Sequence, residues 1–220
     1  MAGRKLLSTA FRAASNGGLP NGGPLILDAA GNLYGTTQGF GAYGYGVVFE
    51  LSPAGDGTWT EQPIYSFNGK DEGSSPYGLA LDGSGLIYGV AIYAQTGYDG
   101  LLFELTQSGG VWNEQVLHRF STTSGEGNNP EGVTVDAAGN LYVTTYFGGK
   151  YDYGTAIKLT PNGAGGWTEK DLHSFTGGPD GAYPASGLIV GVDGDLFGTT
   201  PFGGSTTGSA GCGVVYTLKP

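Results

Sequence analysis

Charged residues, cysteine and long apolar runs are all scarce in this 220-residue chain. Only 13% of the residues are charged, and nine Lys and Arg stand against nineteen Asp and Glu, a net charge of −10. This acidic balance argues against nucleic acid and anionic membrane surfaces as partners, because both would repel the chain. The single cysteine, Cys212, excludes an internal disulfide. No stretch reaches the ~18 apolar residues of a membrane-spanning helix, so no membrane insertion is expected.

Glycine and aromatic residues are abundant instead. The chain has 45 Gly and 11 Pro, together with 3 Trp, 14 Tyr and 10 Phe. So many aromatic residues oppose disorder. So much glycine opposes long helices, because each Gly costs about 1 kcal/mol in a helix relative to Ala. The composition therefore predicts an all-β fold with many tight turns.

One motif returns at a nearly constant spacing. GNLYGTT at 31–37 recurs as SGLIYGVA at 84–91, GNLYVTT at 139–145 and GDLFGTT at 194–200. The repeat period is about 54 residues. Each full repeat holds four short segments that are rich in β-branched and aromatic residues and bounded by Gly, Asn, Asp or Pro, which predicts four strands. Four strands in a repeat of this length make one blade of a β-propeller with antiparallel sheets.

The two ends of the chain suggest how the ring closes. The last repeat stops after its third segment, VVYTL at 214–218, and a spare strand-like segment, KLLSTAF at 5–11, precedes the first repeat. We expect these two segments to pair, because pairing removes an open sheet edge. The chain would then form one domain, 1–220, with four blades. An open fragment of a larger ring is the alternative.

The repeat also resembles a known one. The pattern P-x-G-L-x-x-D-x-x-G-N-L-Y-G-T-T, followed by Y-G-x-V-F-E-L and G-x-W-T-E-x-x-L-x-S-F, is similar to the bacterial Gly-rich propeller repeat of Gloeobacter and Verrucomicrobia. The resemblance runs from Leu6 to Leu218. It implies a β-propeller that is secreted or on the cell surface, and it implies no established chemistry. Met1–Leu7 begins like a signal peptide, but its apolar run ends within a few residues.

Binding residues are expected on one face of the propeller. In each blade the loop after the second strand and the loop after the fourth strand lie on that face, and here these loops are long, aromatic and varied. Tyrosines offer sugar rings a flat apolar face with a polar end. Tyrosines at repeated positions, such as Tyr45 and Tyr153, are expected to pack between blades. The ligand-binding candidates, most of them at departures from the repeat, are Tyr93, Tyr98, Asp99, Tyr146, Lys150 and Asp152.

Loop carboxylates provide an enzymatic alternative. In a small ring they would converge near the axis, where two could serve as acid and base or nucleophile on a glycosidic bond. The same oxygens suit Ca²⁺, and solvated loop charges are the third interpretation. His118 and His173, each two residues before a closing Phe, are interpreted as packed, hydrogen-bonded residues and not as metal ligands. The catalytic candidates are Asp71, Glu72, Asp99, Glu126, Asp152 and Asp180.

The sequence thus predicts a monomeric extracellular propeller that binds a carbohydrate or another extracellular ligand through one aromatic and acidic face. No cofactor is expected, with a structural Ca²⁺ left open. A polysaccharide-active hydrolase or lyase and a protein-interaction scaffold are the alternatives. The fold alone does not choose between them, because propellers have many unrelated functions.

Overall fold

Every strand in the structure pairs with its neighbours in antiparallel fashion. The computed structural model describes residues 17–20, 23–94, 99–121, 125–204 and 211–220, and no α-helix occurs among them. None of the described residues therefore forms a helix that is long and apolar enough to cross a membrane. The first two sheets contain β1 (Ile26–Leu27), β2 (Leu33–Thr37), β3 (Val47–Pro53), β4 (Trp59–Ser66), β5 (Ser74–Leu81), β6 (Ile87–Tyr93), β7 (Leu101–Ser108) and β8 (Val111–Arg119). The last two contain β9 (Gly127–Val135), β10 (Leu141–Gly148), β11 (Thr155–Pro161), β12 (Trp167–Ser174), β13 (Ile189–Val190), β14 (Leu196–Thr200) and β15 (Val214–Leu218).

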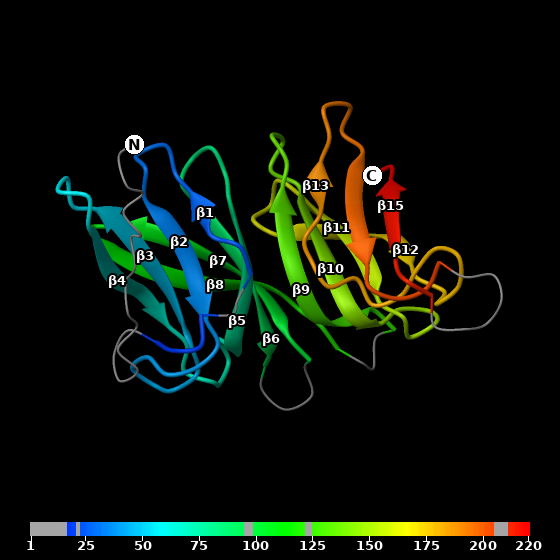
Figure 1. The fold of residues 1–220 in the computed structure, drawn as a ribbon, viewed down its shortest axis with the longest axis horizontal. Coiled ribbons are helices and arrows are strands. Elements are labelled where there is room, and N and C mark those ends of the chain that lie inside the picture. Colours follow the sequence, from blue (N-terminus) through cyan, green and yellow to red (C-terminus); the bar gives the residue numbers. More distant parts are fainter. Residues whose placement is uncertain (1–16, 21–22, 95–98, 122–124, 205–210) are drawn as a thin grey trace, which may run out of the picture.

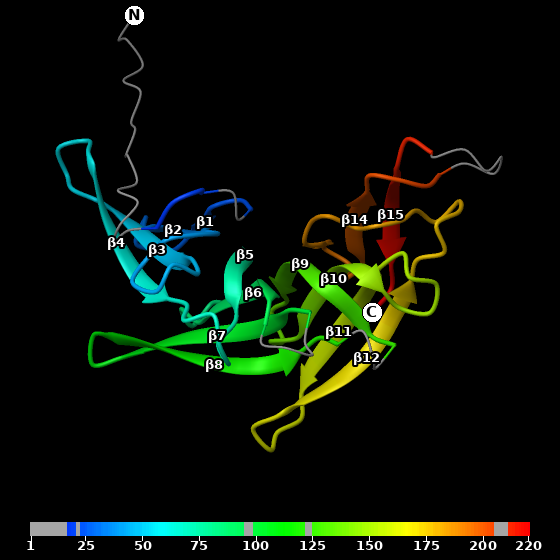
Figure 2. The same ribbon diagram turned by 90° about the horizontal axis from the view of Figure 1, so that it is seen from below.

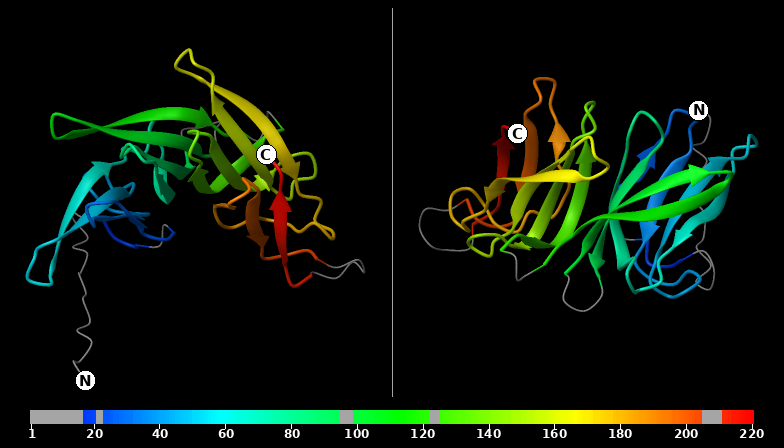
Figure 3. Two further views of the ribbon diagram at one scale, coloured as in Figure 1. Left: turned by 90° about the horizontal axis from the view of Figure 1, so that it is seen from above. Right: turned by 180° about the vertical axis from the view of Figure 1, so that it is seen from behind.

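The four sheets are the blades of a four-bladed β-propeller, as the repeat predicts. Each follows chain order, β1-β2-β3-β4, β5-β6-β7-β8, β9-β10-β11-β12 and β13-β14-β15 (Figure 1). In the views turned by 90° about the horizontal axis, the blades follow one another along an arc, and the first and last sheets lie at its two ends (Figures 2 and 3). The last blade has three strands among the described residues. Segment 5–11, expected to supply the fourth strand, lies outside them.

Aspartate begins the tight turn between the first two strands of a blade. Asp136 Oδ1 accepts hydrogen bonds from the backbone N–H groups of Ala138 and Asn140, and its Oδ2 accepts one from the Tyr142 hydroxyl. Asp28 makes the same set of bonds in the first blade. Burial opposes ionisation of Asp136, but these hydrogen bonds outweigh it and lower its pKa. The D-x-x-G-N turn is therefore a structural element of the first and third blades.

The hydrophobic core lies between neighbouring blades. The Phe that follows each outer strand is fully buried and packs into the third strand of the next blade. Phe67 meets Phe103 edge to face at 5.1 Å between ring centroids, and Phe175 meets Tyr216 in the same way at 4.9 Å. Phe120 belongs to the cluster that contains Ile157. Each such ring contributes about 2–3 kcal/mol by burial.

Tryptophan packs against the previous blade. Trp112 of β8 lies edge to face against Tyr34, and Trp167 of β12 against Tyr88, with centroids 6.4 and 6.5 Å apart. Each Tyr belongs to the second strand of the preceding blade. Trp112 and Trp167 therefore pack between blades, whereas Trp59 packs on Leu51 and its neighbours within the first blade.

Glycines allow the blades to approach one another at the inner strands. A Cβ on Gly78 would lie 3.1 Å from Gly132 Cα, and a Cβ on Gly132 would overlap the backbone nitrogen of Gly187. Gly132 does not have a positive φ, so it is required by space and not by backbone conformation. The glycines mark where three successive blades touch through their backbones.

Gly132→Ala should therefore destabilise the fold by about 2 kcal/mol or more, because the methyl group has no room beside the next blade. Gly83→Ala is the control, since Gly83 has open space around its Cβ position and no positive φ; its effect should stay within about 0.5 kcal/mol. Urea unfolding of the two variants measures both changes. Equal stability of the two variants would contradict the close approach at Gly132.

Candidate functional site

Seven loops form one face of the propeller, called here the loop face. Figure 1 shows the β2–β3, β4–β5 and β10–β11 connections together along its lower edge. A backbone hydrogen bond joins each outer-strand loop to the preceding blade: Ser75 N–H to Tyr45 O at 2.9 Å, and Tyr183 N–H to Tyr153 O at 2.8 Å. The corresponding bond between the second and third blades runs from Asn129 N–H to Asp99 O at 2.7 Å. We call each of these three backbone hydrogen bonds a joint. The described residues of these loops are 38–46, 67–73, 94, 99–100, 120–121, 125–126, 149–154, 175–188, 201–204 and 211–213.

Five aromatic rings gather on this face between the third and fourth blades. Tyr183 is at their centre. It stacks on Tyr146 at 5.0 Å with 21° between the ring planes, and it meets Phe147, Tyr153 and Phe202 edge to face at 5.6, 5.5 and 5.9 Å. Phe147, Tyr153 and Phe202 remain 39%, 37% and 43% exposed. We call these five residues the Tyr183 cluster; its outer rings present apolar faces to solvent.

The backbone around Tyr183 explains why its ring lies there. Tyr183 has a φ of 58°, and Ser75 and Asn129, at the same position of the earlier blades, have φ values of 53° and 52°. On the neighbouring residue, Ala182 N–H donates to Phe202 O at 3.0 Å, which brings the fourth blade's loop alongside. The joint is thus built into the repeat, and only the last copy carries an aromatic side chain.

Polar groups border the cluster. Asp152 accepts a hydrogen bond from Gly148 N–H at 3.0 Å. Burial first, and then Tyr153, Asp152 and Tyr146, raise the pKa of the Tyr183 hydroxyl, so the Asp152 charge acts on this ring. The Lys150 amine lies 5.2 Å from the centre of the Tyr151 ring, which is 46% exposed. Of the ligand residues predicted in the third blade, Tyr146 therefore lies in the Tyr183 cluster and the charge of Asp152 acts on its central ring. Lys150 lies over Tyr151, outside the five rings.

The predicted ligand residues of the second blade lie apart from this cluster. Tyr93 ends β6 and is 57% exposed. Asp99 is half-buried, and its backbone accepts from Asn129. Tyr98 lies outside the described residues. The repeated tyrosines each pack against the loop that leads to the next blade: Tyr45 leaves no room for a Cβ at Gly69, and Tyr153 leaves none at Gly177. Tyr153 also meets Tyr183 from that loop, so its expected packing between blades is confirmed.

Three of the catalytic candidates do not converge on the axis, and that expectation is wrong. Glu72 acts on Tyr65 through a hydrogen bond, Glu126 lies 3.5 Å from His118, and Asp180 lies 2.9 Å from His173. Tyr65, His118 and His173 all belong to the fourth strand of a blade, the strand farthest from the axis. These acids are therefore held at the outer strands by partners of their own blades. The expected hydrogen-bonded environment is confirmed for His173.

The other three candidates are also spread over the loop face. Asp71 is exposed, and its backbone oxygen accepts from the Arg119 guanidinium at 2.6 Å. Asp152 lies in the β10–β11 loop of the third blade, and Asp99 in the β6–β7 loop of the second. These three carboxylates therefore come from loops of different blades, and their catalytic role stays a prediction.

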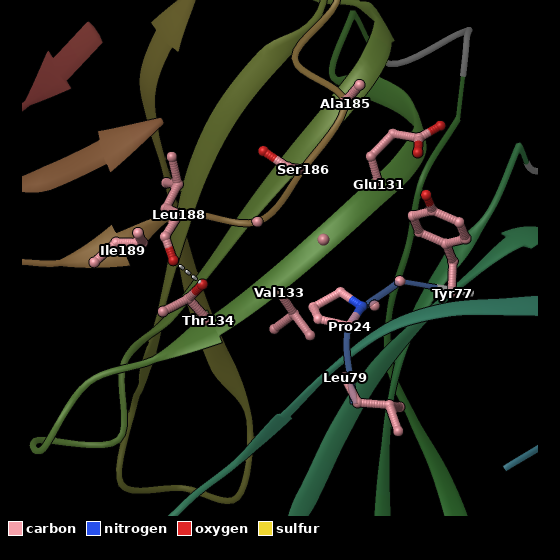
Figure 4. A pocket seen from close by; sticks show the side chains of 14 residues that line it. Pro24, Tyr77, Leu79, Glu131, Val133, Thr134, Ala185, Ser186, Leu188 and Ile189 are labelled. Carbon is pink, nitrogen blue, oxygen red and sulfur yellow. Dashed lines mark hydrogen bonds between the residues drawn. The ribbon is translucent and has the colours of Figure 1, made fainter. Parts of the chain in front are cut away.

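A pocket of about 280 Å³ lies at the axis, where the inner segments of all four blades meet. Its wall includes Pro24, Leu79, Val133 and Ile189, and Thr134 Oγ1 donates to Leu188 O across it (Figure 4). The segment after Tyr183 continues into this wall as Ala185 and Ser186. The pocket and the Tyr183 cluster are therefore joined through one stretch of chain.

Glu131 is the only ionisable carboxylate among the residues that line this pocket. Burial alone raises its pKa to about 7. Tyr77 lies on the same side of the pocket, and burial followed by the Glu131 charge raises its pKa (Figure 4). Glu131 was not among the predicted site residues, because it lies on an inner strand and the predicted residues came from loops. The available signal was the Pro-x-Gly motif, in which the middle residue changes from Tyr77 to Glu131.

Comparison with known proteins identifies the repeat and the fold. A model described as the Gloeobacter/Verrucomicrobia repeat matches residues 82–220. No curated protein matches the chain. Among solved structures, a gluconolactonase from Xanthomonas campestris is 16% identical, with a TM-score of 0.52 over 88% of this chain and 55% of its own.

Two further structures give the same picture. A luciferin-regenerating enzyme is 18% identical with a TM-score of 0.54, over 90% of this chain and 60% of its own. The calcium-binding protein regucalcin from Agrobacterium tumefaciens is 15% identical with a TM-score of 0.50, over 84% and 54%. At these identities the likeness shows the propeller fold alone. The chain spans little more than half the length of these three proteins.

Glu131 should make stability depend on pH. Its pKa rises from the usual 4.5 to about 7 in the fold, so the folded chain holds this proton more tightly than the unfolded chain. The resulting stabilisation is complete below about pH 4.5 and is lost as the pH rises through 7. The pKa difference between the folded and unfolded chain corresponds to at most about 3 kcal/mol of unfolding free energy. We expect about 1–2 kcal/mol, because water reaches the pocket.

Glu131→Gln should therefore match the native chain near pH 5 and exceed its stability by about 1–2 kcal/mol at pH 8.5. Urea unfolding at both pH values measures this, with Glu50→Gln as a control on a half-buried strand position of the first blade. A constant difference between native chain and Glu131→Gln at the two pH values would show that Glu131 ionises normally.

Proposed function

This chain belongs to the Gloeobacter/Verrucomicrobia repeat family, and from that premise and the aromatic rings on its loop face we propose that it binds carbohydrate. The Tyr183 cluster carries the proposal. Its exposed rings are the flat surfaces on which sugar rings stack through their C–H groups. We place the ligand outside the cell, the setting that the resemblance implies, and take the chain to act as a monomer.

Three properties of the cluster favour a sugar over a protein partner. The rings are tied to one another by contacts around Tyr183, so little side-chain entropy is lost when a ligand binds. The Asp152 carboxylate, whose charge acts on Tyr183, can hydrogen-bond hydroxyl groups. The apolar area is broken up by tyrosine hydroxyls, unlike the continuous apolar patch typical of a scaffold surface.

A second candidate function is chemistry in the axial pocket, and Glu131 favours it. A carboxylate with a pKa of about 7 can exchange a proton near neutral pH, as a general acid or base must. Glycoside hydrolysis needs two facing carboxylates, whereas hydrolysis of an ester or lactone can proceed with one base and water. The pocket therefore suits a small ester or lactone better than a polysaccharide.

Tyr183→Asn tests the binding proposal. Asn is the residue at this position in the previous blade, with the same positive φ, so the backbone joint should persist while the central ring is lost. Affinity for any bound glycan should fall at least about tenfold, a loss of about 1.4 kcal/mol. Incubation with a panel of insoluble and soluble polysaccharides, followed by protein depletion and calorimetry, measures the affinity.

Tyr43→Ala is the matched control, because Tyr43 is 62% exposed on the loop face of the first blade and lies outside the cluster. It should bind as the native chain does. Mass spectrometry of the same tubes reports products: new products that disappear in Glu131→Gln would favour the axial pocket. Failure of the native chain to bind any glycan, or unchanged binding by Tyr183→Asn, would rule out the Tyr183 cluster as a sugar site.

A further inference from the structure

Where the second and third blades meet at their outer strands, three potential metal ligands come together. His118 belongs to β8, Glu126 directly precedes β9, and Glu169 belongs to β12. One ligand atom from each lies within 4.8 Å of the other two. The register of β7 with β8 shifts just before His118, leaving Leu117 as an extra residue. Such a bulge bends the strand and redirects the side chain that follows.

The contacts within this group are ion-pair distances and not ordinary hydrogen bonds. His118 Nε2 lies 3.5 Å from Glu126, and His118 Nδ1 lies 3.4 Å from Glu169. A hydrogen bond to nitrogen is usually 2.7–3.2 Å long. His118 Nε2 is buried and has no hydrogen-bond partner among the described residues. Two ligands on one tetrahedral zinc are separated by roughly 3.4 Å, because bonds of about 2.0–2.1 Å meet at the tetrahedral angle. The contact of Nε2 with Glu126 has this length, whereas Glu169 lies beside the other ring nitrogen and must rotate to reach the same metal ion.

The charges in the group are not balanced by one another. Burial first, and then the neighbouring Glu126 and Asp171, raise the pKa of Glu169 to about 7. Burial lowers the pKa of His118, against the opposing effect of Glu126. The neutral imidazole is the form that binds metals. A divalent cation would relieve the repulsion between the carboxylates and satisfy the buried nitrogen.

At the junction between the third and fourth blades, His173 occupies the position of His118, and its ring nitrogen has a hydrogen-bond partner. His173 Nε2 lies 2.9 Å from Asp180, a normal hydrogen-bond length. Asp180 also accepts from Thr176 N–H at 3.0 Å, and these hydrogen bonds outweigh burial and lower its pKa. This histidine has one carboxylate and a short bond to it. The comparison identifies the longer contacts of His118 as specific to the second junction.

The junction between the first and second blades has both carboxylates but no histidine. Tyr65, Glu72 and Glu114 take the three positions, and Glu72 accepts from the Tyr65 hydroxyl. Burial and Glu72 raise the pKa of Glu114 to about 7, and the Arg119 guanidinium opposes this. Ser174 stands at the Arg119 position one blade later, and the charges that act on Glu169 are all negative.

From the side chains gathered at the second junction, we propose that His118, Glu126 and Glu169 bind a divalent transition metal ion of the zinc class. One ring nitrogen and one oxygen from each carboxylate are the ligands, reached by small side-chain rotations, and water completes the tetrahedron. The imidazole nitrogen selects against Ca²⁺ and Mg²⁺, which prefer oxygen ligands. Because Glu169 comes from the third blade, the metal ties two blades together at their outer edge. The site is independent of the carbohydrate proposal.

Zinc binding to the untagged full chain tests the proposal. After treatment with a chelator, the native chain should bind one equivalent of Zn²⁺ by calorimetry and elemental analysis, and its melting temperature should rise with Zn²⁺ but not with Ca²⁺. His118→Gln and Glu169→Gln should each weaken zinc binding at least about tenfold. His173→Gln should bind like the native chain, and so should Cys212→Ser, which removes the exposed thiol.

Tyr65→His provides a test that does not depend on loss of function. It gives the first junction the same three ligand types, and the chain should then bind two equivalents of Zn²⁺. Absence of zinc binding by the native chain would overturn the proposal. Unchanged binding in both His118→Gln and Glu169→Gln would place the metal elsewhere and overturn it equally.

Discussion

The packing of one buried Phe against the next blade supports the rest of this structure. Phe67, Phe120 and Phe175 each leave the outer strand of one blade and pack among residues of the next. A single blade cannot bury its own apolar faces, so the hydrophobic effect acts between blades and not within them. The closing Phe also fixes the start of the following loop. The geometry of the loop face is thus a consequence of core packing.

The three junctions between successive blades share one backbone geometry but carry different side chains. The backbone joint at Ser75, Asn129 and Tyr183 has nearly the same φ each time, and its stability does not depend on the side chain it carries. The third copy can therefore place an aromatic ring at the surface. By the same logic the outer-strand position holds Tyr65 in one junction and His118 in the next. Repetition secures the scaffold and leaves single positions free to vary.

The two candidate sites differ in how much the sequence revealed of them. Tyr146 was predicted because the loop of the third blade is long and aromatic, and Asp152 because it departs from the repeat. Tyr183 and Glu131 were missed. Each lies directly next to a Pro in a segment that is otherwise regular, where a single substitution is easily read as ordinary variation. Departures at individual repeat positions were a better guide here than loop length.

The sequence alone determined the fold class and the blade number, because repeat period, turn residues and apolar alternation are local properties of the chain. Only the tertiary structure decided which side chains meet. Glu126 was expected near the axis, but its approach to His118 holds it at the outer strand. The meeting of His118 with Glu169 joins residues 51 positions apart in two blades. Such proximity depends on blade twist and on a strand bulge, and neither is visible in the spacing of residue types.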